Sequence, residues 1–136
     1  MTAVDFGEWA VPNLELTFGG DTYQVPPPTV EDSKKLLAAA VRAEVGLGLV
    51  KGEIPDEIAA VLATIQPGEH PALGEVYEVL AAAGVPQATI DRMGYYATFY
   101  WARGKSYADA LAGILWGPSP DPVEGETGDG DDGPKG

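Results

Sequence analysis

The stretch YYATFYWARG, residues 95–104, places five aromatic rings and two alanines in ten positions and ends at a glycine. At about 100° per residue, four of these rings share one broad face of a helix, and Trp101 lies just beyond that face. A helix that is apolar around most of its girth belongs at the centre of a bundle, packed on two or more sides. Stacking platforms for nucleic acid instead set aromatic rings in a positively charged groove, and only Arg92 and Arg103 are nearby. The stretch therefore predicts a central core helix, with the groove of a protein partner as the alternative.

Apolar residues recur at helical spacing through the rest of the chain up to residue 116, between breaks at glycine and proline. Thr29 and Asp32 resemble a capping box at the start of the first helix. We expect helices over residues 30–47, 55–65, 71–83, 86–103 and 106–116. The residues expected in the core are Leu36, Leu37, Val41, Ile58, Leu62, Tyr77, Leu80, Tyr96, Phe99, Tyr100, Trp101, Leu111 and Ile114.

A β-hairpin is predicted before these helices, over about residues 13–26. LELTF alternates apolar and polar residues, GGD supplies a turn in which Gly19 and Gly20 can take positive φ, and TYQV resumes with residues that favour strands. Leu14, Leu16 and Phe18 should share one face. The three prolines that follow end the second strand, because proline cannot donate a hydrogen bond to a β-ladder.

Composition changes after Trp116. Residues 117–136 contain no aromatic residue, one aliphatic side chain and repeated glycine and proline, and they carry −5 of the formal charge of −13. Such a segment cannot bury enough apolar surface to offset the entropy of ordering. We therefore expect a mainly α protein: a domain over residues 1–116, made of the hairpin and a compact bundle of about five helices, followed by a disordered acidic tail.

Composition also argues against several classes of function. No run approaches the roughly 18 apolar residues of a membrane span, the N-terminus lacks a signal-peptide pattern, and the chain has no cysteine. The negative charge disfavours binding to phosphate backbones, which depends on Lys and Arg. We expect a soluble, cytoplasmic protein that binds neither nucleic acid nor membranes.

The residues give no support for catalysis, and we expect neither an enzyme nor a bound cofactor. His70 is the only histidine, and its neighbours Glu69 and Glu75 match no metal-ligand spacing. No serine lies in a GxSxG elbow, and GLGLVKG, residues 46–52, lacks the phosphate-loop pattern and follows a helix instead of a strand. The acidic tail lacks the distal glutamate of a calcium loop.

The order of the expected elements and several sequence segments resemble those of a known protein family over about residues 4–116. These segments are FGEW, LELTFGGDTYQVPPP, VEDSKKLLAAAVRAEVGLGLVKG, HPALGEVYE, ATIDRMGYYATFYWARG and ADALAGILW, and the ending GPKG continues them. The sequence resembles the tail assembly chaperones of long-tailed (siphovirus-type) phages that infect actinobacteria.

This resemblance implies a non-enzymatic protein that binds the tape measure protein and keeps it soluble in the host cytoplasm until tail tube protein assembles around it. Such a chaperone is not expected in the mature virion. Many members also exist in a longer form made by programmed ribosomal frameshifting, and Pro134-Lys135-Gly136 is compatible with a slippery codon run. The expected partners are thus the tape measure protein, the longer form and tail tube protein, with a homo-oligomer left open.

No motif marks the partner-binding residues. Exposed apolar candidates are Phe6, Trp9, Val11 and Trp116, which lie at the ends of the expected domain; the alternative is that they pack onto the domain's own surface. Two other functions also remain open. One is a structural tail or connector protein that is retained in the virion, and the other is an acidic DNA mimic that inhibits a host DNA-binding protein.

Overall fold

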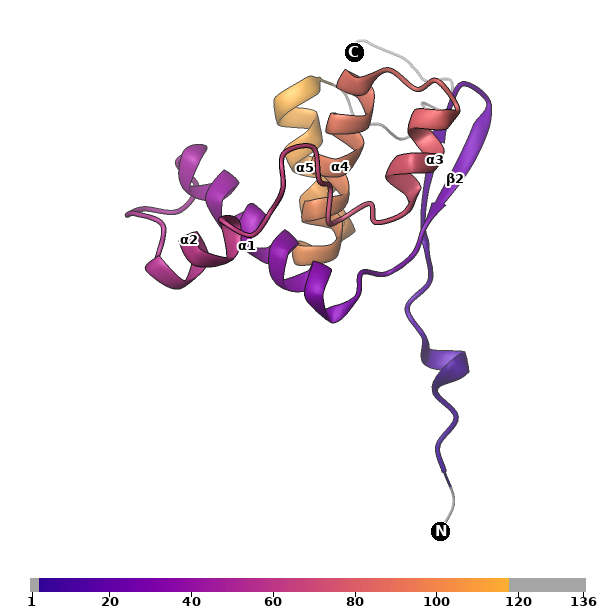
Figure 1. The fold of residues 1–136 in the computed structure, drawn as a ribbon, viewed down its shortest axis with the longest axis horizontal. Helices are drawn as coiled ribbons and strands as arrows, with labels where there is room; N and C mark the ends of the chain where they lie inside the picture. The colour runs from indigo at the N-terminus through magenta and orange to yellow at the C-terminus, as the bar shows by residue number, and fades with distance from the viewer. Residues whose placement is uncertain (1–2, 118–136) are drawn as a thin grey trace.

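A computed structural model of the protein describes residues 3–117 and has an N-terminal hairpin followed by five helices (Figure 1). The expected acidic tail, apart from Gly117, lies outside the described residues. Among residues 3–117, no helix combines the length and the apolar character that crossing a membrane requires. In chain order the elements are a 3-10 turn η1 (Phe6–Trp9), β1 (Leu14–Phe18), β2 (Asp21–Val25), α1 (Val30–Gly46), α2 (Asp56–Leu62), α3 (Val76–Ala82), α4 (Gln87–Arg103) and α5 (Lys105–Trp116).

The hairpin forms at the predicted place. β1 and β2 pair antiparallel with Phe18 opposite Asp21, so that only Gly19 and Gly20 connect them. Both glycines have positive φ, 63° and 87°. A two-residue type I′ hairpin turn needs positive φ at both of its central residues. Leu14 is buried, Leu16 is half-buried and Phe18 at the tip is 40% exposed, so the predicted apolar face is covered less and less from the open end of the hairpin to its tip.

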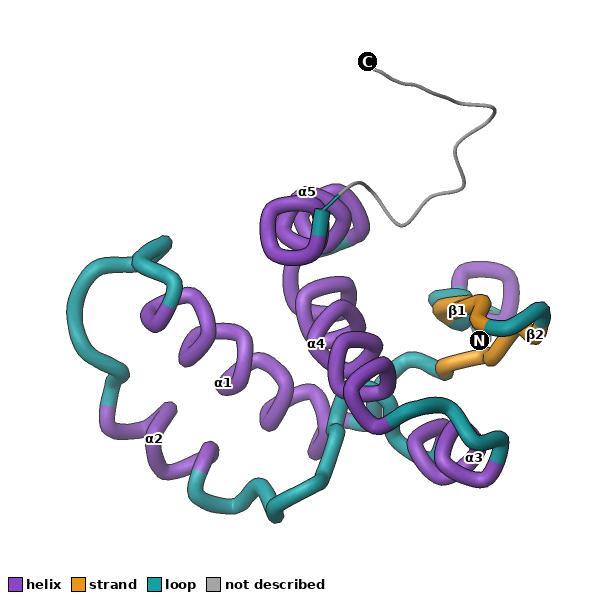
Figure 2. The backbone as a smooth tube through the Cα atoms, turned by 90° about the horizontal axis from the view of Figure 1, so that it is seen from above, coloured by secondary structure: helices purple, strands orange, loops and turns teal. Residues whose placement is uncertain are grey.

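Helix α4 occupies the centre of the molecule, as its aromatic sequence predicts. It packs against α1, α3 and α5, and Figure 2 shows it between α1 on one side and the hairpin with α3 on the other. Its residues Ala97 and Phe99 are fully buried. The remaining rings of the stretch are half-buried and pack around two core clusters, one toward the hairpin and α3 and one toward α5.

The predicted core residues fall into three groups. Four are buried (Leu36, Leu80, Phe99, Leu111), and seven are half-buried (Val41, Ile58, Leu62, Tyr77, Tyr96, Tyr100, Trp101). The prediction is wrong for Leu37 and Ile114, which are 43% and 79% exposed. Leu37 lies about 100° around α1 from Leu36, outside the stripe that packs on α4. Helix α5 packs chiefly on α4 through Ala108, Leu111 and Ala112, and this narrow contact leaves Ile114 in solvent.

Helix boundaries agree with the sequence expectation except in α2 and α3. Helix α2 ends at Leu62, three residues before the expected end. Helix α3 begins at Val76, whereas a start at Pro71 was expected. The reason is Gly74, whose φ of 56° interrupts a helix; the segment before it forms turns, with the N–H groups of Leu73 and Gly74 donating to the carbonyl of His70.

Candidate docking surface

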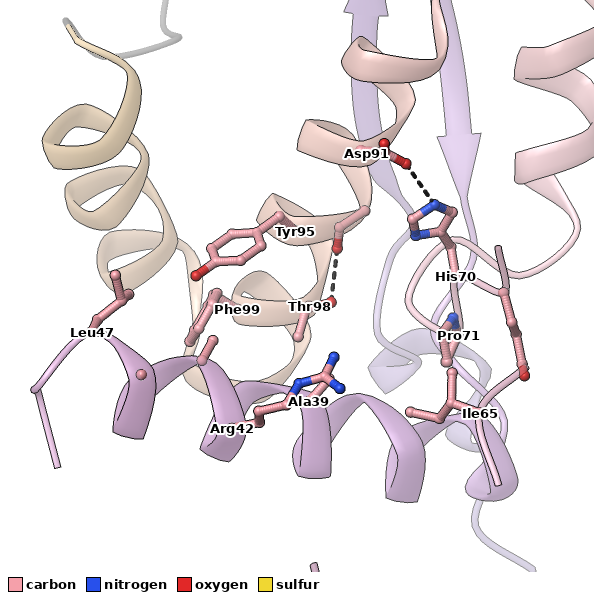
Figure 3. Close-up of a pocket in the computed structure, with 14 residues that line it drawn as sticks. Ala39, Arg42, Leu47, Ile65, His70, Pro71, Asp91, Tyr95, Thr98 and Phe99 are labelled. Carbon is pink, nitrogen blue, oxygen red and sulfur yellow. Dashed lines mark hydrogen bonds and ion pairs between the residues drawn. The ribbon is translucent and has the colours of Figure 1, made fainter. Parts of the chain in front are cut away.

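A cleft opens where α1 and α4 cross and then diverge (Figure 3). It has a volume of about 550 Å³. One wall is α1 with its C-terminal cap, the second is α4, and the loop between α2 and α3 closes one end. The lining residues are Ala39, Arg42, Ala43, Gly46, Leu47, Ile65, Glu69, His70, Pro71, Asp91, Gly94, Tyr95, Thr98 and Phe99.

Small side chains keep this cleft open. Ala39 and Ala43 lie one turn apart on α1, so no large side chain of α1 fills the space between the two helices at these positions. On α4, Gly94 is a point of close contact with the α2–α3 loop. A Cβ atom at this position would lie 2.7 Å from Nδ1 of His70, and the imidazole ring therefore rests on bare backbone.

Hydrogen bonds hold His70 in this position. Its Nε2 lies 3.0 Å from Oδ1 of Asp91, and the same oxygen accepts a bond of 2.9 Å from Nε2 of Gln87. The hydroxyl of Tyr77 donates in turn to Oε1 of Gln87, at 3.3 Å. This chain of bonds ties the loop to α3 and α4. Residues 3–117 contain no group of histidines and carboxylates arranged to hold a metal ion, and we assign His70 to the wall of the cleft.

Glu69 at the end of the cleft is held as a carboxylate. The backbone N–H of Gln66 donates to its Oε1 at 2.8 Å, and Lys35 donates to its Oε2 at 2.9 Å. These two bonds, the backbone one first, lower the pKa of Glu69 below its ordinary value. The charge of Glu69 is therefore already matched by a cation of the same chain.

Arg42 differs from the other charged groups of the cleft. Its side chain lines the cleft on the α1 side and is exposed (Figure 3). Within the described part of the chain, no carboxylate forms an ion pair with it. The cleft thus combines an apolar lining, to which Leu47, Ile65 and Phe99 contribute, with an arginine that has hydrogen-bonding capacity left for another molecule.

A second polar cluster, around Glu44, is structural. The Glu44 carboxylate is buried, and Arg103 donates to both of its oxygens, at 2.9 and 2.8 Å, while the Tyr107 hydroxyl donates to Oε2 at 2.7 Å. The bonds from Arg103 and Tyr107 lower the pKa of Glu44 although burial opposes this. The cluster joins α1, α4 and α5, and its acceptors are used within the protein.

The N-terminal arm, defined here as residues 4–11, forms the other apolar surface. Phe6 and Trp9 are 66% and 67% exposed and contact each other edge to face, with ring centroids 5.3 Å apart; Val11 is exposed as well. Figure 1 shows the arm leaving the hairpin and running away from the helices. The alternative that these residues pack onto their own domain is therefore wrong for all three.

Trp116, the fourth candidate, lies elsewhere. It is half-buried at the end of α5, with its ring edge to face on Tyr95 at 6.1 Å and the guanidinium of Arg92 5.3 Å from the ring centroid. These contacts hold the end of α5 on α4. The structure thus does not bring Trp116 together with the other three predicted residues.

Sequence reasoning missed the cleft itself. Its walls come from three separate segments of the chain, and no motif connects Arg42 or Leu47 with the α2–α3 loop. One local signal was present: Gly94 stands in the middle of the aromatic α4, where a glycine costs stability relative to alanine and so indicates a packing reason.

A comparison with protein families finds one match. A family described as "Domain of unknown function (DUF7426)" matches residues 4–132, which is almost the whole chain. No curated protein and no solved structure matches this chain. The protein described here, with its hairpin, central aromatic helix and open α1–α4 cleft, therefore belongs to the DUF7426 family.

Proposed function

We propose that this protein is a phage tail assembly chaperone that binds helical segments of the tape measure protein and keeps them soluble during tail morphogenesis. The resemblance of its sequence phrases to such chaperones suggests the role. The structural observation that supports it is the open cleft between α1 and α4, an apolar surface in a strongly acidic protein.

The cleft has the properties of a site for one face of an amphipathic helix. Helix-in-groove recognition places apolar side chains at i, i+3, i+4 and i+7 against an apolar groove between helices. The small residues Ala39 and Ala43 allow another backbone to come close, and Leu47 and Ile65 offer apolar contact at either side. The negative charge of the rest of the protein would keep the complex in solution.

The test is co-expression of the full chain with the tape measure protein, measuring the soluble fraction of the latter. Leu47→Lys places a charge in the cleft at the C-terminal cap of α1, whereas Leu37→Lys places the same charge on α1 outside the cleft. The two leucines are equally exposed in the free protein, 42% and 43%. We expect Leu47→Lys to lower the soluble tape measure protein several-fold and Leu37→Lys to leave it near the wild-type level.

Equal solubility with and without the wild-type chain would contradict the proposed function. Equal effects of the two substitutions would contradict the assignment of the cleft while leaving the chaperone role in place. Thermal unfolding of both variants, followed by circular dichroism, checks that each chain is folded.

A further inference from the structure

The arm and the cleft are two apolar surfaces with complementary shapes, one protruding and one hollow. The arm carries Phe6 and Trp9 as paired rings, both about two-thirds exposed. The cleft has a volume of about 550 Å³, within the range of roughly 300–1,000 Å³ in which protein pockets enclose a ligand of several rings. We propose that the arm of one copy of this protein binds in the α1–α4 cleft of a second copy.

The charges of the two surfaces are also complementary. The arm contains Asp5 and Glu8 and no basic residue. The Asp5 side chain accepts one hydrogen bond, from the backbone N–H of Gly7, and has further acceptor capacity. In the cleft, Arg42 lacks an ion-pair partner among residues 3–117. A carboxylate of the arm beside this guanidinium gains a charge-assisted bond, and an aromatic ring of the arm can also stack on its planar face.

The carboxylates already present in the cleft do not compete for Arg42. Glu69 is bonded to Lys35 and to the backbone of Gln66. Asp91 is bonded to His70 and Gln87. Both groups lie toward the α2–α3 loop, so an arm that enters beside Arg42 finds an unmatched positive charge and an apolar lining.

The arrangement of the fold favours binding between copies over binding within one chain. The arm ends two residues before β1, and α4 separates the hairpin from α1 in Figure 2. In Figure 1 the arm points away from the helices. A chain whose arm leaves on one side and whose cleft opens on another presents both halves of a contact to its neighbours, which gives a heterologous association.

This inference does not depend on the proposed function, and it adds a means of regulation to it. Binding of the arm in the cleft of a second copy covers exposed apolar side chains of both surfaces while no other partner is present. A helix that binds in the same cleft must displace the arm, so self-association and partner binding compete.

The experiment is sedimentation velocity of the full chain at a series of concentrations and at low salt, with charge-reversal variants. Arg42→Glu sets a negative cleft against a negative arm, and the double variant Asp5→Lys/Glu8→Lys sets a positive arm against Arg42. We expect each to weaken self-association by at least about tenfold, because like charges meet at the contact. Lys34→Glu is the matched control, since it reverses the charge of an exposed residue on α1 that does not line the cleft.

Mixing the two charge-reversal proteins in equal amounts gives the decisive result. In the mixture each arm finds a cleft of opposite charge on the other protein, so we expect association to return to near the wild-type level. A mixture that stays dissociated would overturn the proposal, as would a wild-type chain that remains monomeric at all concentrations. If Lys34→Glu weakened self-association as much as Arg42→Glu, the proposal would also be overturned, because the net charge of the protein would then control association. These outcomes decide whether the arm binds the cleft, and the co-expression experiment decides separately whether the chain keeps the tape measure protein soluble.

Discussion

Gly94 and His70 meet in the wall of the cleft with no space between ring and backbone. A Cβ at Gly94 would lie 2.7 Å from His70 Nδ1, and the bond between His70 and Asp91 restrains the ring from moving aside. We expect Gly94→Ala to lower the free energy of unfolding by about 1–3 kcal/mol, as for other overpacked sites. Urea denaturation measures the change.

Gly113 provides the control for this substitution. It lies in α5, and a Cβ atom added there meets no atom within 4 Å. Gly113→Ala should therefore stabilise the protein by about 0.5–1 kcal/mol, since alanine loses less backbone entropy than glycine in a helix. If both substitutions stabilised the protein, the contact between Gly94 and His70 would not be restrictive.

The buried carboxylate of Glu44 should make stability depend on pH. Its pKa is lowered in the folded protein, first by the bonds from Arg103 and also by the Tyr107 hydroxyl. A lowered pKa contributes stability that is present above the unfolded value, about 4.3 for glutamate, and is lost as the pH falls through the folded value. We expect Glu44→Gln to cost about 1–3 kcal/mol at pH 7.

The difference between Glu44→Gln and the wild type should shrink as the pH falls below about 4, because the Glu44 carboxyl of the unfolded wild-type chain then binds a proton. It should be lost once the pH has fallen through the lower pKa of the folded protein. Urea denaturation of both proteins at pH 7 and at a series of acidic pH values measures this difference. A gap that stays constant down to the acid limit would show that the charge of Glu44 does not provide the stabilisation.

At the scale of elements, α4 organises the helices around Phe99. This side chain is 1% exposed and stacks on Tyr107 of α5 with centroids 5.6 Å apart. Phe99→Ala removes a whole ring from a filled site, so we expect it to cost about 3–5 kcal/mol. Ile114→Ala in α5 should change stability by less than about 0.5 kcal/mol, because that side chain is already in solvent.

Thermal and urea unfolding of the two variants compares them directly, and similar losses would contradict the assignment of the core. The other rings of the stretch should contribute less than Phe99. Tyr96 and Trp101 are half-buried, so their replacement by alanine should cost less than the value expected for full burial.

At the scale of the whole molecule, the resemblance to tail assembly chaperones predicts a second gene product. Expression of the native gene together with its downstream DNA should give a minor, longer protein with the same N-terminus, because Pro134-Lys135-Gly136 can be encoded by a slippery run. The acidic segment before it would then act as a linker that raises the effective concentration of a second binding segment. Intact mass spectrometry separates the two products. Detection of the 136-residue product alone would remove frameshifting from the proposal.

Much of the fold was predictable because its signals are local. Each of these signals comes from residues close together in the sequence: the Gly19-Gly20 turn, the Thr29 cap and the apolar spacing along α4. Thr29 does accept a bond from the backbone N–H of Asp32, at 3.1 Å. The start of α3 was the least accurate boundary, since the positive φ of Gly74 overrides the apolar spacing around it.

The sequence by itself thus determined the elements, their order and the central place of the aromatic helix, because hydrogen bonding and apolar spacing along one segment specify these. Only the tertiary structure decided that Leu37 and Ile114 face solvent, that Glu44 is paired with Arg103, and that α1 and α4 diverge to leave a cleft. Whether a helix side chain is buried depends on which helix faces pack against each other. The cleft depends on the crossing of two helices far apart in the chain, and on a loop that rests against the bare backbone of Gly94.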